Sequence, residues 1–252
     1  MEKIKHSLRI DDIGASSKEY EVYSNKWQGL GNFLIFKYLP YFKAWGPYRE
    51  LNSIELQEML SILEKNHAKL TVAITAAWVN KDGSLAPYPE KFPEQANILK
   101  EGLEQGLLEI ANHGLTHCIE TNNMFLPRLF TSNRKYHREF WSWRPEIEHD
   151  EHLKKSQEIL SNYFKTNIVT LVPPGNVYSD ATLVAAKKYG IKYINCNTAD
   201  TVINGINIIS NNNVTAFHDR ELIIHGIDWL KTAKNNKPTD TQWVFVRDLH
   251  ND

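Results

Sequence analysis

The sequence is poor in cysteine, with only Cys118 and Cys196 among 252 residues. Two thiols cannot build the disulfide framework of a small secreted domain, and they fit a reducing compartment at least as well as one disulfide. The first residues lack the apolar stretch of a secretory signal, and no run approaches the roughly 20 apolar residues of a membrane-spanning helix. We therefore expect a cytoplasmic protein without a transmembrane segment.

The sequence also lacks an excess of either charge, with a formal net charge of −1. Without a basic excess we expect no nucleic-acid partner. Hydrophobic residues make up 42% of the chain, which is enough for a sizeable core. No repeat, low-complexity tract or linker divides the sequence, so we predict one catalytic domain over 1–252; the oligomeric state is left open.

Short apolar segments alternate with segments of helical periodicity. Residues 69–79 are almost wholly apolar, as in a strand buried on both faces, whereas 51–67 has helical spacing after a capping Asn52 or Ser53. This alternation predicts an α/β fold with a parallel sheet of about seven strands, which we expect to close, or nearly close, into a barrel with its chemistry at the C-terminal strand ends. The expected strands are 6–14, 69–79, 107–114, 167–176, 191–197, 206–210 and 221–228, and the expected helices are 51–67, 92–106, 145–164, 179–190 and 239–251.

Two long segments, near 18–50 and 119–145, interrupt the alternation. Both follow expected strands and both are rich in aromatic and basic residues. Loops of this length in a compact domain are usually functional. We expect them to overhang the face that carries the chemistry. Their aromatic rings could bind sugar rings and their arginines a phosphate or uronate, although loop packing is the ordinary role of such residues; the candidates are Trp27, Trp45, Trp78, Trp141, Trp143, Arg134, Arg138 and Arg144.

Residues that bind metals or move protons follow several of the expected strands. Because the C-terminal ends of parallel strands share one face of a barrel, we expect these residues to lie together. They are Asp11 and Asp12 after the first strand, His113 and His117 in NHGLTH after the third, the turn PPGN at 173–176 after the fourth, and His225 and Asp228 in the last.

One carboxylate and two imidazoles form a usual ligand set for catalytic zinc, with a position left open for water. The tandem acids suggest two roles, because adjacent residues of a strand point to opposite sides. One acid binds the metal, and the other approaches the water and removes its proton. His225 can then protonate the leaving amine or alcohol, with Asp228, Asp200 or Asp219 as a candidate orienting acid.

Each motif also has an ordinary structural interpretation. With ten histidines in the chain, an H-x-x-x-H spacing arises fairly often by chance, and such residues commonly lie on the surface or in a satisfied core. Of two acids in tandem, one can cap a turn while the other is solvated. The shared position after apolar strands favours the metal site.

The ordered motifs IDDIG, EIANHGLTH, VPPGN and LIIHGID resemble those of the polysaccharide deacetylase family, the carbohydrate esterases with NodB homology. The resemblance implies a distorted (β/α) barrel and a divalent metal, zinc before others, held by Asp12, His113 and His117. It implies Asp11 as general base and His225 as general acid. The implied substrate is an N-acetylated or O-acetylated sugar, and acetate is a product.

The third motif departs from the family pattern, which usually reads Arg-x-Pro-x-Gly. Here Val172 stands at the arginine and Asn176 at the glycine, in a divergent Pro-Pro-x-Asn turn. Asn tolerates positive φ better than most residues, and the Gly175 N–H can stabilise an oxyanion. The family arginine orients the base, so Arg9, Arg220 or an arginine of the second insertion is a candidate replacement.

From these motifs we predict a metal-dependent hydrolase that removes an acyl group, N-acetyl before O-acetyl, from a carbohydrate. An intracellular precursor in surface-polysaccharide synthesis is one such substrate. The alternative is a catalytically silent sugar-binding protein, which the missing arginine motivates. A two-metal phosphoesterase needs more bridging ligands than the strand ends supply.

Overall fold

The structure is a computed structural model that describes residues 4–24, 31, 35–118, 129–130, 138–235 and 241–249. Its main sheet has nine strands, in the order β10-β11-β9-β8-β7-β4-β1-β12, with β13 paired to β1. The strands are β1 (Lys5–Ile13), β4 (Leu70–Ile74), β7 (Leu108–Asn112), β8 (Thr170–Leu171), β9 (Tyr193–Cys196), β10 (Thr201–Ile203), β11 (Ile206–Ser210), β12 (Val214–His218) and β13 (Gln242–Trp243).

Seven strands of this path, from β11 to β12, run parallel to their neighbours, and β10 pairs antiparallel with β11. The expected barrel-like α/β fold with about seven parallel strands is confirmed. The ring does not close, because within the described residues β11 and β12 form no pair. Only residues 211–213 connect these two strands, and paired parallel strands need a crossover of a dozen or more residues.

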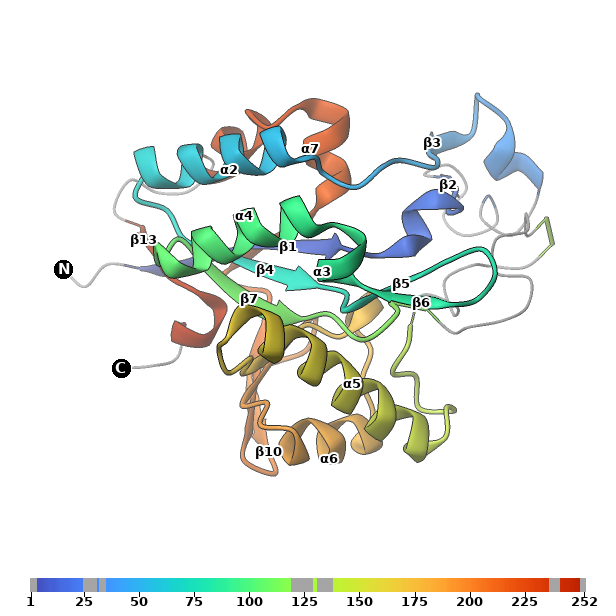
Figure 1. The fold of residues 1–252 in the computed structure, drawn as a ribbon, viewed down its shortest axis with the longest axis vertical. Coiled ribbons are helices and arrows are strands. Elements are labelled where there is room, and N and C mark those ends of the chain that lie inside the picture. Colours follow the sequence, from blue (N-terminus) through green and yellow to red (C-terminus); the bar gives the residue numbers. More distant parts are fainter. Residues whose placement is uncertain are drawn as a thin grey trace.

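Helices pack along the sheet (Figure 1). In that view α2 and α7 lie above β1, β4 and β7, and α5 and α6 lie below them, while α4 and α5 contribute Leu99 and Leu160 to the same core cluster. The strands point toward the end of the molecule that holds the small hairpins β2–β3 and β5–β6. The helices are α2 (Ser53–Lys65), α3 (Tyr88–Lys91), α4 (Pro93–Glu104), α5 (Glu146–Phe164), α6 (Asp180–Lys188), α7 (Asp219–His225) and α8 (Trp229–Asn235); the hairpin strands are β2 (Tyr23–Ser24), β3 (Lys43–Trp45), β5 (Ala77–Val79) and β6 (Leu85–Pro87).

Helix starts follow the capping residues that the sequence indicated. The Asn52 side chain accepts from the Glu55 N–H at 2.9 Å, and the Glu55 carboxylate accepts from the Asn52 N–H at 2.9 Å. This reciprocal capping box satisfies two donors that the first turn of α2 would leave unpaired. Ser179 and Thr182 form the same kind of box at the start of α6.

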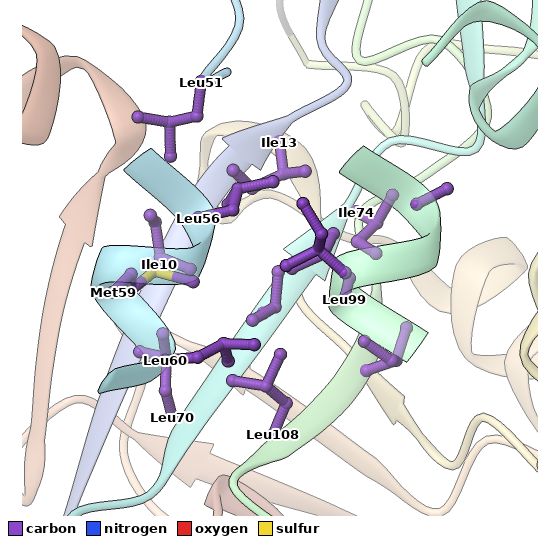
Figure 2. Packing of buried hydrophobic residues seen from close by; sticks show 14 of the residues in the cluster. Ile10, Ile13, Leu51, Leu56, Met59, Leu60, Leu70, Ile74, Leu99 and Leu108 are labelled. Atoms are coloured by element: carbon purple, nitrogen blue, oxygen red, sulfur yellow. The ribbon is translucent and has the colours of Figure 1, made fainter. Parts of the chain in front are cut away.

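The largest core cluster lies between α2, α4 and the strands β1, β4 and β7 (Figure 2). Helix α2 directs Leu56, Met59 and Leu60 toward the sheet, and α4 adds Leu99. Met59 is 0% exposed. Burying side chains of this size stabilises a fold by about 1.5–3 kcal/mol each, so this layer fixes the strands that carry the candidate site.

Three expected elements are wrong. Residues 221–228 are not a strand: helix α7 ends at His225, and the true strand β12 precedes it. The apolar residues of α7 divide between the core and solvent, with Leu222 buried and Ile224 53% exposed, as a helix requires. In 239–251 the structure describes β13 and a 3₁₀ turn at Val246–Asp248 instead of a helix, because this backbone bonds to the sheet. The expected strand 69–79 is two strands, β4 and β5.

None of the helices in the described ranges is both long and apolar enough to cross a bilayer.

We expect the substitution Met59→Ala to lower the free energy of unfolding by about 2–5 kcal/mol, because it removes a fully buried side chain and leaves a cavity. The neighbouring Glu58 is exposed on the same helix, and Glu58→Ala should stay within about 0.5 kcal/mol of wild type. Urea unfolding measures both. Equal effects of the two substitutions would contradict the packing of α2.

Candidate active site

The two acids Asp11 and Asp12 line one cavity of about 370 Å³ at the C-terminal end of β1. Regular alternation would put them on opposite sides of the strand. The pairing of β1 with β4 shifts register between Ile10 and Ile13, which marks a β-bulge, and Asp12 has a φ of 69°. The bulge therefore turns both carboxylates into the same space, contrary to the expectation from alternation.

His113 and His117 come from the loop that follows β7, and both are buried. His113 Nδ1 lies 2.6 Å from the Val172 carbonyl oxygen. Since a carbonyl only accepts, Nδ1 donates to it, and Nε2 faces Asp12 Oδ1, 3.3 Å away. His117 has a φ of 59°, and its Nε2 lies 3.1 Å from the same Asp12 oxygen.

This trio has the geometry of a three-ligand metal site. One ligand atom from each of Asp12, His113 and His117 lies within 4.8 Å of the other two. Zinc ligands at 2.0–2.2 Å in tetrahedral geometry lie about 3.3 Å apart, and the observed N···O separations match this value. The described residues thus fit a divalent cation, and the structure brings together the three residues that the sequence predicts as its ligands.

The Asp12 carboxylate is the anionic centre of this group. Burial alone raises the pKa of Asp12, but His218, His117 and His113 outweigh that effect and hold the pKa well below its usual range. Burial lowers the pKa of His117, and the charge of Asp12 reverses this and raises it. Asp12 therefore stays ionised, and its carboxylate can bind a cation.

Arg9 supplies the guanidinium that the third motif lacks. It is 1% exposed and lies two residues before Asp11, on the same face of β1. Its Nε lies 2.8 Å from Asp11 Oδ1 and its Nη2 2.7 Å from Oδ2, a bidentate pair that fixes the carboxylate plane. Arg9 also donates to Asn195 Oδ1 and, at 3.1 Å, to Asn211 Oδ1. Of the three replacements that the sequence offered, Arg9 contacts the acid.

His218 was missed by the sequence reading, and it lines the cavity at the end of β12. It lies opposite Asp11 in the register of β1 and β12. Its Nδ1 is 3.5 Å from Glu221 Oε2, and Glu221 also accepts from the His218 N–H at 2.7 Å. The alternating segment Val214–His218 followed by acids at a helix start was the available signal.

His225 and its candidate orienting acids lie elsewhere. His225 is exposed at the end of α7 and does not line the cavity. Asp228 is exposed and pairs with Lys231 at 2.6 Å, and Asp200 accepts from the Ser210 N–H at 2.6 Å. The reason is the misassigned strand: the residues of α7 begin where β12 ends. Asp219 is buried against Lys18 and accepts from Tyr48 Oη at 3.1 Å.

The PPGN turn forms another wall of the cavity, where Gly175 and Asn176 have φ values of 63° and 56°. A Cβ at Gly175 would lie 2.8 Å from Arg138 Cγ, so the turn needs glycine for both conformation and space. The Val172 side chain is buried with Ala73 and Ala111.

The mouth of the cavity combines aromatic and charged residues. Trp45 stacks on Tyr23 with ring centroids 5.5 Å apart, and Arg220 lies 4.4 Å over the Trp45 ring. Glu21 and Arg138 also line the cavity. Of the aromatic and basic candidates, Trp45 and Arg138 line the cavity, Trp78, Trp141, Trp143 and Arg144 do not, and Trp27 and Arg134 lie outside the described residues.

The model of the polysaccharide deacetylase family matches residues 52–194, which is more than half of the chain. The chain belongs to the polysaccharide deacetylase family. No curated protein matches its sequence.

Solved structures with the same fold include a mutant of a CE4 family pseudoenzyme of Bacillus anthracis with restored enzymatic activity. That structure has a TM-score of 0.51 and 13% identity, with 98% of this chain and 67% of that chain covered. A 4-alpha-glucanotransferase from Thermococcus litoralis has a TM-score of 0.52 and 10% identity, with 98% and 40% covered. At these identities the likeness shows the fold alone.

We expect His218 to titrate near pH 9 in the metal-free chain. Burial lowers the pKa of His218, but the charges of Asp12 and Asp11 and the hydrogen bond to Glu221 outweigh burial and the opposing charge of Arg220, and raise the pKa to about 9. Protonation of His218 therefore stabilises the fold fully below about pH 6.5, and this contribution is lost as the pH rises through about 9.

NMR titration of the imidazole carbons of metal-free protein measures this pKa. Glu221→Gln should lower it, because the substitution removes the partner charge, whereas Asp228→Asn removes an exposed carboxylate and should leave it unchanged. A His218 resonance that titrates at its ordinary value in wild type would contradict the assigned surroundings.

Proposed function

We propose that the protein is a metal-dependent carbohydrate deacetylase that hydrolyses an N-acetyl group from a sugar. One observation carries the proposal: the Arg9-bound carboxylate of Asp11 lies in the same cavity as the three candidate ligands Asp12, His113 and His117. A base fixed beside a cation site is the arrangement that hydrolysis of an amide by water requires.

In the proposed reaction Asp11 accepts a proton from the attacking water as the water oxygen bonds to the acyl carbon. The bidentate contact with Arg9 holds the Asp11 carboxylate in one orientation during this step. The Gly175 N–H is the proposed donor to the developing oxyanion, since Gly175 lines the same cavity. A divalent cation, Zn²⁺ before others, at Asp12, His113 and His117 would supply Lewis-acid polarisation of the carbonyl and of the water.

His218 is the proposed general acid, in place of His225. It donates a proton to the sugar nitrogen as the C–N bond breaks, which yields acetate and a free amine. In the metal-free chain its pKa is raised to about 9, and Glu221 orients the ring. Burial raises the pKa of Glu221, but His218 and Arg220 lower it to about 2, so this partner stays ionised.

The Tyr23–Trp45 stack beside the cavity supports a sugar as the substrate. Flat aromatic rings bind the apolar faces of sugar rings, and the Arg220 guanidinium over Trp45 adds a charged group at the mouth. A catalytically silent sugar-binding protein was the alternative that the missing arginine motivated. The contact of Arg9 with Asp11 removes that motive and supports activity.

We expect Asp12→Ala to abolish tight metal binding, because it removes one of three ligands, and Asp11→Asn to retain the metal but lower the rate of acetate release by about 10²–10⁴-fold. Metal content after dialysis against zinc and acetate release from acetylated amino sugars measure the two effects. Asp228→Asn, on the surface, is the control and should behave as wild type. Full activity of Asp11→Asn would refute its assignment as base.

A matched pair of histidine substitutions separates the two candidate acids. His218→Gln should lower acetate release by about 10²-fold or more, because a positioned proton donor is lost, whereas the exposed His225→Gln should leave the rate unchanged. The effect should shrink with substrates whose leaving group needs no proton, such as aryl acetates. Loss of activity in His225→Gln alone would reverse the assignment.

A further inference from the structure

Glu139 binds the loop that carries His117. This residue belongs to the second insertion, and its side chain is 1% exposed. Its carboxylate accepts from three consecutive backbone N–H groups, those of Leu115 at 2.9 Å, Thr116 at 3.3 Å and His117 at 3.0 Å. Successive N–H groups that converge on one anion form a concave backbone site whose shape depends on that anion.

The same carboxylate is held from its other side. His152, on α5, places Nδ1 2.6 Å from Glu139 Oε1. Gly114 begins the loop at a φ of 81°, and a Cβ there would lie 2.2 Å from Glu139 Oε2, so the chain accommodates the carboxylate with a glycine. Glu139 thus connects the insertion, the loop after β7 and helix α5.

The loop needs such a support because its end is conformationally unfavourable. His117 adopts a φ of 59°, a region that non-glycine residues populate rarely, and such residues persist only where their surroundings determine them. In this conformation the imidazole Nε2 reaches Asp12 Oδ1 at 3.1 Å. Among the described residues, the His117 backbone N–H donates to Glu139.

We propose that Glu139 is a positioning residue for the metal site: its carboxylate holds the backbone of residues 115–117 in the conformation that aims His117 at Asp12. This inference rests on the proposed function, because it concerns the ligands of the proposed cation. It also gives the second insertion a role, since Glu139 belongs to that insertion.

The test is the affinity for Zn²⁺ alone, measured by competition with a chromophoric chelator, in wild type and Glu139→Gln. The amide replaces one acceptor oxygen by an NH₂ group that faces the loop donors, so we expect metal binding to weaken by about 10–100-fold. The visible spectrum of the Co²⁺-loaded chain should change in intensity, because the ligand geometry is altered.

The matched control is Glu109→Gln. Glu109 is also 1% exposed and lies on β7, where it accepts from Thr71 Oγ1 at 2.7 Å and Thr170 Oγ1 at 2.5 Å, but it makes no hydrogen bond to the loop. It should lose thermal stability without losing Zn²⁺ affinity. If Glu139→Gln does not fold, His152→Asn is the second variant, and it should weaken Zn²⁺ binding by a smaller factor.

If the wild type binds Zn²⁺ and a folded Glu139→Gln variant binds it with unchanged affinity, this inference is overturned and the proposed function stays intact. If Glu139→Gln fails to fold, a His152→Asn variant that binds Zn²⁺ with wild-type affinity overturns the inference in the same way. If Glu109→Gln weakens Zn²⁺ binding as much as Glu139→Gln does, the inference is also overturned, because the loss of any buried carboxylate would then have the same effect. Wild type that binds no metal overturns the proposed function and this inference together.

Discussion

The candidate site depends on a break in the regular alternation of β1. A regular strand would send Asp11 and Asp12 to opposite faces of the sheet. The bulge, with Asp12 at a φ of 69°, brings both carboxylates into one cavity. Two neighbouring carboxylates with little solvent repel each other, so each needs its own charged or hydrogen-bonding partner. The guanidinium of Arg9 serves Asp11, and the two imidazoles of the loop after β7 serve Asp12.

These separate partners also divide the proposed roles. Both oxygens of Asp11 accept from Arg9, so this carboxylate has a fixed plane and remaining lone pairs that can take a proton from water. One oxygen of Asp12 faces two imidazole nitrogens at distances that a shared cation would produce. A metal ligand needs other ligand atoms close to it, whereas a general base needs a contact that orients it while leaving it free of the metal. The surroundings of the tandem acids meet these two requirements in turn.

The sequence predicted the parts of this structure that local patterns determine. The capping residues Asn52 and Ser179 indicated helix starts, and apolar runs indicated the inner strands. Both signals depend only on a few neighbouring residues of the sequence. The sequence did not identify His218 as the candidate acid, because the segment after β12 has an apolar run that suits a strand as well as a short helix. The strand was therefore assigned to that segment, and His225 was chosen in place of His218. The bulge and the contact of Glu139 were not predictable, since both depend on segments that meet only in the folded chain.

The relocated arginine shows why a departure from a family motif does not by itself mean lost chemistry. A guanidinium that orients Asp11 needs a position within reach of the carboxylate, and the side chain two residues earlier on the same strand face has one. At the arginine position of the turn, the Val172 side chain makes an apolar contact instead. The other edge of Arg9 bonds to Asn195, on β9, and to Asn211, in the connection between β11 and β12. A fully buried guanidinium requires such partners for its remaining donors, and these two asparagines supply them. The unusual source of the orienting arginine therefore comes with two asparagine partners that keep its buried guanidinium hydrogen-bonded.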